Sequence, residues 1–252
     1  MNHIIFILAG GDGKRMNSDL PKVLHSVNGL PMIIHVLDSA IQTNPLKIVI
    51  IVGKHYNQIK NTIESYNIFN IEYIIQENPM GTGHAVMCCN HVILQNINTN
   101  VLILNADVPL IKHTTLNHLI DNHNDVSLIV TDLDNPFGYG RIILDNNNDF
   151  LNIVEEKDCN DNEKKITTIN SGIYIFKSTL LNKYLSKISN YNAQCEYYLT
   201  DLLKIIKNHE KNTHFQMYNL DKKQQIEILG INNKQQLENI EKKLKNLKKI
   251  KY

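Results

Sequence analysis

A glycine-rich loop near the start of the chain carries residue types that can hold a phosphate chain. Gly10, Gly11 and Gly13 follow an apolar run. Glycines let the backbone approach an anion closely and aim its N–H groups at it. Downstream, the Arg15 guanidinium can bind two phosphate oxygens at once, and Lys22 adds a compact charge. We predict a phosphate site with Arg15 and Lys22 as its catalytic cations; the alternative is a glycine turn flanked by surface cations.

The spacing of this loop excludes two common phosphate-binding motifs. It is not a Walker A loop, because Gly13-Lys14 is followed by Arg15 rather than by serine or threonine. The glycines also lack the G-x-G-x-x-G spacing of dinucleotide-binding folds. The loop therefore indicates a different class of nucleotide site.

A second candidate, Asp107, follows the apolar run Val101–Ala106. Ligands of parallel α/β sheets collect at the carboxyl ends of the strands. A carboxylate there suits Mg²⁺, which prefers oxygen ligands and substrate phosphates. Asp107 could instead cap a helix after Pro109. We favour the metal role because the pattern of a strand followed by an aspartate already points to it.

The elements that must position these residues alternate in the first half of the chain. The strand-like runs are His3–Ala9, Leu46–Val52, Ile71–Ile75 and Val101–Ala106. The helix candidates between them are Pro31–Thr43, Tyr56–Tyr66 and Thr82–Leu94. Strands rich in isoleucine and valine, separated by helices, indicate βαβ units and a mostly parallel sheet. We predict a Rossmann-like α/β fold flanked by helices.

The second half changes character and predicts a lobe interleaved with this core. Its strand-like runs are Asp125–Asp132, Gly140–Leu144, Phe150–Glu155, Thr168–Phe176, His214–Asn219 and Glu227–Gly230. Its helix candidates are Ser178–Ile188 and Glu196–His209, followed by a C-terminal helix at about 233–250. The apolar residues of that last helix are Leu237, Ile240, Leu244, Leu247 and Ile250. We expect one stripe to pack on the domain, although a basic membrane-surface helix is an alternative.

Composition narrows the class of protein. The chain has 252 residues, 42% of them hydrophobic, and its 26 basic and 25 acidic side chains leave a formal charge of +1. This length fits a single domain, 1–252. The balanced charge gives no reason to expect a nucleic acid partner. No stretch approaches the roughly 18 uncharged apolar residues of a membrane span, so no membrane partner is expected.

The cysteines and the N-terminus indicate a cytoplasmic location. Cys88, Cys89, Cys159 and Cys195 show no metal-ligand spacing, and adjacent cysteines pair poorly. The N-terminal run lacks the basic start and longer apolar core of a signal peptide. Reduced thiols in a cytosolic protein are the plain interpretation.

The motifs stand in the order found in a known family. Leu8-Ala9-Gly10-Gly11-x-Gly13-x-Arg15-Met16, with Pro21-Lys22, resembles the signature of the sugar-phosphate nucleotidyltransferases. The further motifs are Gln76-Glu77-x-x-x-Gly81-Thr82-Gly83-His84-Ala85, Asp107-Val108-Pro109-Leu110, Gly138-Tyr139-Gly140-Arg141-Ile142, Ile153-Val154-Glu155-x-Lys157-Asp158, Ile169-Asn170-Ser171-Gly172-Ile173, Asn192-Ala193-Gln194-x-Glu196-Tyr197-Tyr198-Leu199-Thr200-Asp201 and Gly230-Ile231-Asn232-Asn233. Over residues 3 to about 235, this set is similar to the uridyltransferase domain of the bacterial N-acetylglucosamine-1-phosphate uridyltransferases.

The resemblance implies an enzyme that transfers UMP from UTP to N-acetylglucosamine 1-phosphate with Mg²⁺, giving UDP-N-acetylglucosamine and pyrophosphate. It makes residues 1–123 the nucleotide-binding half and residues 124–232 the sugar-binding half. Bacterial relatives append an acetyltransferase of hexapeptide repeats; nothing after Asn232 resembles one, so no acetyltransferase domain is expected. The alternatives are another sugar 1-phosphate, such as glucose 1-phosphate, another nucleotide, or a regulatory subunit that binds a sugar nucleotide without turnover.

The resemblance also implies residue roles. Around the nucleotide it implies Leu8, Ala9, Gly10, Gly11, Gln76, Gly81 and Thr82. Around the sugar it implies Asn105, Gly140, Glu155, Asn170, Tyr197 and Thr200. Gln76 would read the uracil edge, since an amide offers both a donor and an acceptor. Asn232 would join Asp107 on Mg²⁺.

Three positions depart from the family pattern. Asn105-Ala106 stands where the family commonly has Tyr-Gly, Cys195 replaces a glycine, and Leu229 replaces an acidic residue. The first two abut the expected sugar site. The reaction type is therefore better specified than the sugar.

Overall fold

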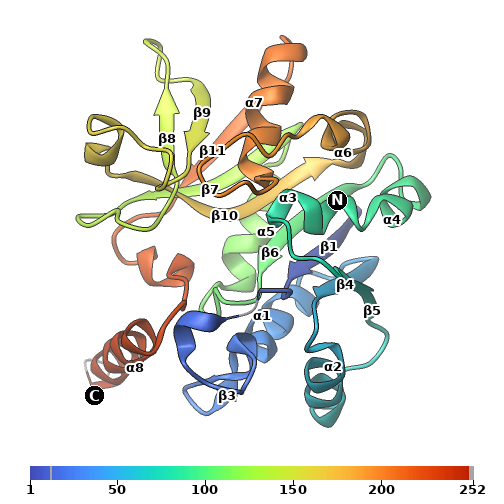
Figure 1. Ribbon diagram of the computed structural model, residues 1–252, viewed down its shortest axis with the longest axis vertical. Coiled ribbons are helices and arrows are strands. Elements are labelled where there is room, and N and C mark those ends of the chain that lie inside the picture. The colour runs from blue at the N-terminus through green and yellow to red at the C-terminus, as the bar shows by residue number, and fades with distance from the viewer. Residues whose placement is uncertain (12, 250–252) are drawn as a thin grey trace.

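The computed structural model describes residues 1–11 and 13–249. In that part of the chain, nine strands form one sheet in the order β11-β7-β10-β6-β1-β4-β5, and β8 and β9 branch from β10 (Figure 1). These strands are β1 His3–Leu8, β4 Lys47–Val52, β5 Glu72–Ile75, β6 Asn100–Asn105, β7 Val126–Asp132, β8 Arg141–Leu144, β9 Phe150–Val154, β10 Thr168–Lys177 and β11 Phe215–Asn219. A short hairpin, β2 Ser26–Val27 and β3 Leu30–Pro31, lies apart from this sheet.

The strands of the first half pair in parallel, as predicted. β1 pairs with β4 on one side and with β6 on the other, and β4 pairs with β5. In the second half, β10 runs antiparallel to both β6 and β7, while β11 runs parallel to β7. The α/β fold with a mostly parallel, helix-flanked sheet is confirmed. The second half continues this sheet through β10, β7 and β11, so the two halves share one backbone framework.

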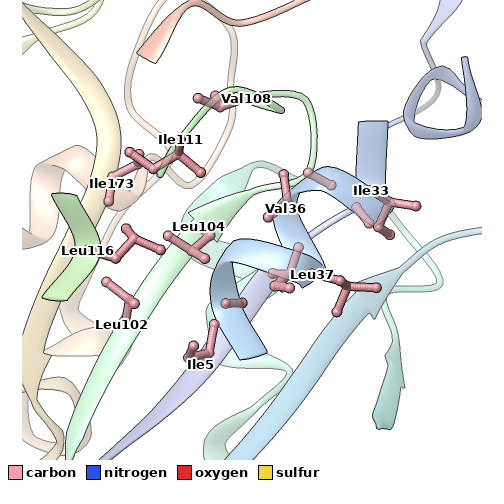
Figure 2. Close-up of a cluster of buried hydrophobic side chains, with 14 of the residues drawn as sticks. Ile5, Ile33, Val36, Leu37, Leu102, Leu104, Val108, Ile111, Leu116 and Ile173 are labelled. Atoms are coloured by element: carbon pink, nitrogen blue, oxygen red, sulfur yellow. The ribbon is translucent and has the colours of Figure 1, made fainter. Parts of the chain in front are cut away.

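Helices cover both faces of the sheet. They are α1 Met32–Ile41, α2 Tyr56–Ser65, α3 Thr82–Met87, α4 Asn90–Gln95, α5 His113–Asp121, α6 Ser178–Tyr184, α7 Leu199–His209 and α8 Lys234–Lys249. Because side chains of a strand alternate between faces, Ile5 joins one apolar cluster and Phe6 the other. Figure 2 shows Ile5 and Leu104 beside Val36 and Leu37 of α1. The two cores fix the strand ends at which the polar motifs lie.

Three predicted elements differ from the structure. The predicted helix Thr82–Leu94 is broken between α3 and α4. The predicted helix Glu196–His209 begins only at Leu199, because the backbone of Tyr198 is extended, with a φ of -79° and a ψ of 126°. Glu227–Gly230 is not a strand: Gln225–Ile228 is a 3-10 turn in which the buried Glu227 carboxylate accepts hydrogen bonds.

The C-terminal helix packs on the domain through an apolar stripe. Ile240 of α8 joins Val27 and Ile231 in a small buried cluster, with Leu237 and Leu244 packed against it. Ile250 and the side chain of Leu247, which the periodicity also included, lie outside the described residues.

No helix in the described chain is both long enough and apolar enough to cross a membrane. The cytoplasmic location and the absence of an acetyltransferase domain stay predictions.

Candidate functional site

Two adjoining clefts lie where the predicted site residues converge. The wide cleft has a volume of about 620 Å³ and the narrow cleft about 180 Å³. The predicted residues that line the wide cleft are Leu8, Ala9, Gly10, Gly11, Arg15, Lys22, Gln76, Gly81, Thr82, Asn105, Asp107 and Asn232. Those that line the narrow cleft are Leu8, Thr82, Asn105, Gly140, Glu155, Asn170 and Thr200. Leu8, Thr82 and Asn105 line both, so the clefts meet at the ends of β1 and β6.

The glycine loop brings its backbone close to neighbouring groups. A Cβ added to Gly10 would lie 3.1 Å from Gln76 Oε1, and one added to Gly13 would lie 2.7 Å from Lys22 Cβ. Gly13 also has a φ of +62°, which favours glycine. The absence of a side chain at Gly13 therefore lets the loop fold directly onto Lys22.

Four side chains from distant parts of the chain form a polar cluster on the wall of the wide cleft. Lys22 Nζ donates to Asp107 Oδ2 at 2.5 Å and to Asn232 Oδ1 at 3.1 Å. Arg15 donates to the same Asn232 oxygen at 3.2 Å, across 217 residues of sequence. The Lys22 and Asp107 side chains are only 14% and 19% exposed. The predicted catalytic and metal-binding residues are thus brought together.

The backbone holds the two predicted metal ligands at a fixed separation. Asp107 comes two residues after β6, and Asn232 comes two residues before α8. The Ile231 N–H donates to the Asp107 carbonyl at 2.9 Å. Upstream of Asn232, buried Glu227 accepts from Lys112 Nζ at 2.7 Å. The segment carrying Asn232 is therefore tied directly to the segment carrying Asp107.

The donor set fits a magnesium ion that shares its coordination with a substrate. One carboxylate oxygen and one amide oxygen are the ligand types that Mg²⁺ accepts, and it commonly takes only one or two protein ligands. Among the described residues, no cluster of three or more His, Cys, Asp or Glu side chains could cage a metal. Asp107 and Asn232 therefore suit an ion completed by phosphate oxygens and water.

The amide of Gln76 is buried beside the glycine loop. The side chain is 4% exposed and lines the wide cleft. Its Nε2 donates to the Gly81 carbonyl at 3.2 Å and lies 2.8 Å from His84 Nδ1. Gly81 has a φ of +107°, and a Cβ there would lie 2.6 Å from the Tyr197 carbonyl oxygen, so this position requires glycine.

The narrow cleft is lined by hydrogen-bonding groups that already engage one another. Thr200 Oγ1 donates to Glu155 Oε1 at 2.9 Å, and Asn170 Nδ2 donates to the Tyr174 hydroxyl at 2.6 Å. The Asn170 N–H also donates to the Gly140 carbonyl at 2.9 Å. Burial raises the pKa of the Glu155 carboxyl above its ordinary value, and nearby carboxylates add to the effect. This cleft offers acceptors for hydroxyl and amide groups.

Asn105 joins the sheet to the wall of the narrow cleft. Its Nδ2 donates to the Gly172 carbonyl at 3.1 Å, where β10 departs from regular pairing with β7 between Asn170 and Tyr174. Gly172 has a φ of +76°, and a Cβ there would lie 2.4 Å from Asn105 Nδ2. The residue that departs from the family pattern therefore braces the irregular segment of β10.

Tyr197 lies beside the clefts rather than in the lining of either one. Its N–H donates to the Met80 carbonyl at 2.8 Å, and its carbonyl accepts from the Gly83 N–H at 2.7 Å. Its ring lies 6.2 Å from the His84 ring, centroid to centroid. In this structure Tyr197 supports the segment that follows Gln76.

Several residues that line or support the clefts were not singled out from the sequence. Among the lining residues these include Gln194 and Glu196 in the wide cleft and Tyr139 and Tyr174 in the narrow cleft. Arg141, 2% exposed, donates to the Tyr139 carbonyl and pairs with Glu156 at 2.8 Å, so it fixes the loop before β8. Membership in a quoted motif was the only available signal for Gln194, Glu196, Tyr139 and Arg141. Tyr174 lies just beyond a quoted motif and had no signal.

Comparison with known proteins agrees with this geometry. A family model described as "Nucleotidyl transferase" matches residues 4–220. A protein of Acanthamoeba polyphaga mimivirus, named "Probable UDP-N-acetylglucosamine pyrophosphorylase", is 46% identical over 242 residues, which cover 94% of each chain. The "Bifunctional protein GlmU" of Legionella pneumophila (strain Philadelphia 1) is 41% identical over 250 residues, or 96% of this chain. The chain spans only 52% of that bifunctional protein.

The fold has solved counterparts. The crystal structure of a UDP-glucose pyrophosphorylase complexed with UDP-glucose matches with a TM-score of 0.70 at 18% identity, covering 83% of this chain and 88% of that one. This likeness concerns the fold. The family model and the mimiviral relative show that the chain belongs to the nucleotidyl transferase family.

Proposed function

We propose that the chain transfers UMP from UTP to N-acetylglucosamine 1-phosphate, yielding UDP-N-acetylglucosamine and pyrophosphate. The observation that carries this proposal is the meeting of two unlike clefts at Leu8, Thr82 and Asn105. The wide cleft has the cations and backbone for a triphosphate, and the narrow cleft has the acceptors for a sugar. The name of the mimiviral relative, which matches nearly end to end, supports the same assignment.

The reaction requires no covalent intermediate. A phosphate oxygen of the sugar 1-phosphate attacks the α-phosphorus of UTP in line, and the bond from that phosphorus to the oxygen leading to the β-phosphate breaks. The electron pair leaves with pyrophosphate. The enzyme's contribution is to position the two anions and to neutralise the charge that develops.

Lys22 and Arg15 would neutralise charge on the triphosphate. Asp107 and Asn232 hold the Lys22 ammonium at the cleft wall, and Asn232 also accepts from Arg15. A cation within reach of the charge that develops on the phosphates, in a cleft partly shielded from water, stabilises the transition state strongly.

Asp107 and Asn232 would hold the metal, and the oxygens that now accept from Lys22 are the ones that would bind it. When bound, Mg²⁺ supplies positive charge that offsets the α-phosphate and the departing pyrophosphate. The ion and Lys22 would then share the same anionic neighbours, which requires Lys22 to turn towards the phosphates.

On the sugar side, we assign hydroxyl and N-acetyl recognition to the Gly140 backbone, Glu155 and Asn170. A Cβ on Gly140 would lie 2.9 Å from Ile153 Cγ2 and 3.4 Å from Glu155 Oε2, so the bare backbone lets the wall close around the sugar. Thr200 orients the Glu155 carboxylate through its hydroxyl donor. Tyr197 would contribute through its backbone support of Gly83 rather than by direct contact.

One observation favours a second candidate within the same reaction class. Asn105, at the junction of the clefts, stands where the family commonly has tyrosine, and its amide is committed to Gly172. Because this wall residue departs from the family pattern, the second candidate is another sugar 1-phosphate, such as glucose 1-phosphate. A subunit that only binds a sugar nucleotide would have no need for Lys22, Asp107 and Asn232 to converge.

The test is a panel of sugar 1-phosphates against the four nucleoside triphosphates, read by pyrophosphate release. We expect the highest kcat/KM for UTP with N-acetylglucosamine 1-phosphate. Faster turnover of glucose 1-phosphate would establish the second candidate. No release with any pair would support the binding subunit, and equal use of purine triphosphates would contradict the assignment of uracil.

A further inference from the structure

The buried amide of Gln76 is held in one orientation by the protein around it. Its nitrogen faces the Gly81 carbonyl at 3.2 Å. A carbonyl oxygen can only accept, so the atom facing it must be the amide nitrogen rather than the oxygen. The same carbonyl accepts from the Ala85 N–H at 3.1 Å, so the first turn of α3 fixes its place.

His84 is the second partner of this amide. Its Nδ1 lies 2.8 Å from Gln76 Nε2 and must offer a lone pair, because the amide nitrogen carries only hydrogens. A neutral imidazole protonated on Nε2 meets this requirement. The Tyr197 ring lies at 36° to the imidazole, and the Tyr197 carbonyl binds the neighbouring Gly83 N–H. The ring is therefore supported from outside the helix.

Both amide hydrogens are engaged by the protein, so the expectation that the amide offers uracil a donor as well as an acceptor is wrong. Only the Gln76 oxygen remains for a ligand. That oxygen lies beside Gly10, since a Cβ on Gly10 would come within 3.1 Å of it. An acceptor in the cleft favours a base whose edge presents an N–H group. Uracil presents N3–H. Cytosine in the same pose would set its N3 lone pair against the Gln76 oxygen, and it could reach that oxygen only by shifting to use its N4 amino group.

We propose that His84 is a positioning residue that determines pyrimidine specificity: by accepting a hydrogen bond from Gln76, it keeps the amide oxygen turned towards the base and favours UTP over CTP. The inference rests on the proposed function, because it assumes that the base of UTP lies against Gln76. In the described part of the chain, His84 lines neither cleft. The orientation of the Gln76 amide is therefore set by a residue behind the cleft wall.

The test compares two replacements of His84. His84→Phe keeps a flat ring against Tyr197 but removes the acceptor. His84→Asn restores an acceptor, because its side-chain oxygen can take the place of Nδ1. The matched control is His91→Phe on α4, where the imidazole is 58% exposed and pairs with Glu72. The kcat/KM values for UTP and for CTP are measured with N-acetylglucosamine 1-phosphate, and the melting temperature is measured for every variant.

We expect His84→Phe to lower the ratio of kcat/KM for UTP over CTP by roughly three- to tenfold, the worth of one lost hydrogen bond. His84→Asn should keep most of the wild-type ratio, and His91→Phe should leave the ratio unchanged. Where His84→Phe does not fold, His84→Ala takes its place in the same comparison.

An unchanged ratio in the variant without an acceptor would overturn the proposal. An equal fall of the ratio in His84→Asn would also overturn it, because the ratio would then not depend on an acceptor at this position. These outcomes differ from failure of the proposed function, in which the wild-type protein itself would not turn over UTP.

Discussion

The wide and narrow clefts adjoin, but opposite kinds of sheet pairing build them. The wide cleft lies at the carboxyl ends of the parallel strands β1, β5 and β6, where a glycine loop, Lys22 and Asp107 meet. The narrow cleft lies where β10 runs antiparallel to β7 and β8, with Glu155 and Thr200 on its wall. The first supplies positive charge and free backbone, and the second supplies acceptors already joined by hydrogen bonds.

The difference teaches how one sheet can hold two chemically unlike substrates. A triphosphate needs cations that neutralise charge during reaction, whereas a sugar needs fixed acceptors at defined positions. Changes in the wide cleft should therefore alter turnover and the use of UTP or metal. Changes in the narrow cleft should alter the KM of the sugar phosphate.

The largest expected effect lies in the wide cleft. Lys22→Ala should lower kcat roughly 10²–10³-fold, by analogy with the loss of one preorganised donor to the transition state. The KM for UTP should change much less, because base contacts remain. Steady-state kinetics measure both constants, with Lys187→Ala, on the exposed surface, as the control. Near-normal turnover in Lys22→Ala would show that Lys22 does not neutralise charge in the transition state.

The opposite pattern is expected for Glu155 in the narrow cleft. Glu155→Gln should raise the KM for the sugar 1-phosphate roughly 10- to 100-fold, the worth of a hydrogen bond to a charged group, and leave the KM for UTP nearly unchanged. Glu64→Gln on α2 serves as the control. An equal rise in both KM values would contradict the assignment of the sugar phosphate to the narrow cleft and of UTP to the wide cleft.

Glu155→Gln should also change the stability of the fold, and this change should be favourable, whereas its effect on sugar binding is harmful. Burial raises the pKa of Glu155 in the folded protein, so the folded state binds its proton more tightly than the unfolded state. Ionisation of Glu155 therefore reduces stability as pH rises from its unfolded pKa to its folded pKa. At neutral pH, Glu155→Gln should melt at the same temperature as the wild type or higher, and at acidic pH this advantage should shrink. A melting temperature of Glu155→Gln below that of the wild type at pH 7 would contradict burial as the cause of the raised Glu155 pKa.

A smaller, metal-specific effect is expected for Asn232→Ala. Loss of one neutral oxygen should raise the Mg²⁺ concentration at half-maximal rate several-fold, because Asp107 still supplies the charged ligand. Activity is titrated against Mg²⁺, with Asn239→Ala on the same end of the chain as the control. A lowered maximal rate with unchanged metal dependence would place Asn232 on the substrate rather than on the ion.

An effect of similar, modest size is expected at the junction of the clefts. Asn105→Ala removes the donor to the Gly172 carbonyl and loosens the irregular segment of β10. The KM for the sugar 1-phosphate should rise roughly three- to tenfold, as for one hydrogen bond. The ratio of kcat/KM for UTP over CTP should stay at the wild-type value. A change confined to the nucleotide would assign Asn105 to the wide cleft instead.

Local sequence patterns predicted the strands that form the wide cleft better than the strands that form the narrow cleft. Isoleucine-rich runs located β1 and β4 to within a residue or two, since a buried parallel strand leaves a continuous apolar run. The insertion of β10 between β6 and β7 had no such signal, because strand pairing over long sequence separations depends on the whole sheet. The resemblance assigned Glu155 and Asn170 to the sugar, but it did not indicate the hydrogen bonds that hold their side chains.

Buried polar partners were the least predictable features. Arg141 is 2% exposed and pairs with Glu156, yet in a sequence an arginine reads as a surface cation. The ion pair of Lys22 with Asp107 joins residues 85 apart, which no periodicity encodes. One signal was overlooked: Asn28-Gly29, both with positive φ, is a dipeptide typical of tight hairpins and joins β2 to β3.

The most direct test of metal-dependent uridylyl transfer at this site compares the wild type with Asp107→Asn. The rate of UDP-N-acetylglucosamine formation from UTP and N-acetylglucosamine 1-phosphate is measured against Mg²⁺ concentration, with the melting temperature as a control for folding. The wild-type rate should rise from none in excess chelator to a plateau. Asp107→Asn, which keeps the size of the side chain but loses its charge, should melt normally and stay roughly 10²-fold or more below that plateau. Full activity in excess chelator, or an Asp107→Asn variant with the wild-type metal dependence, would contradict the account.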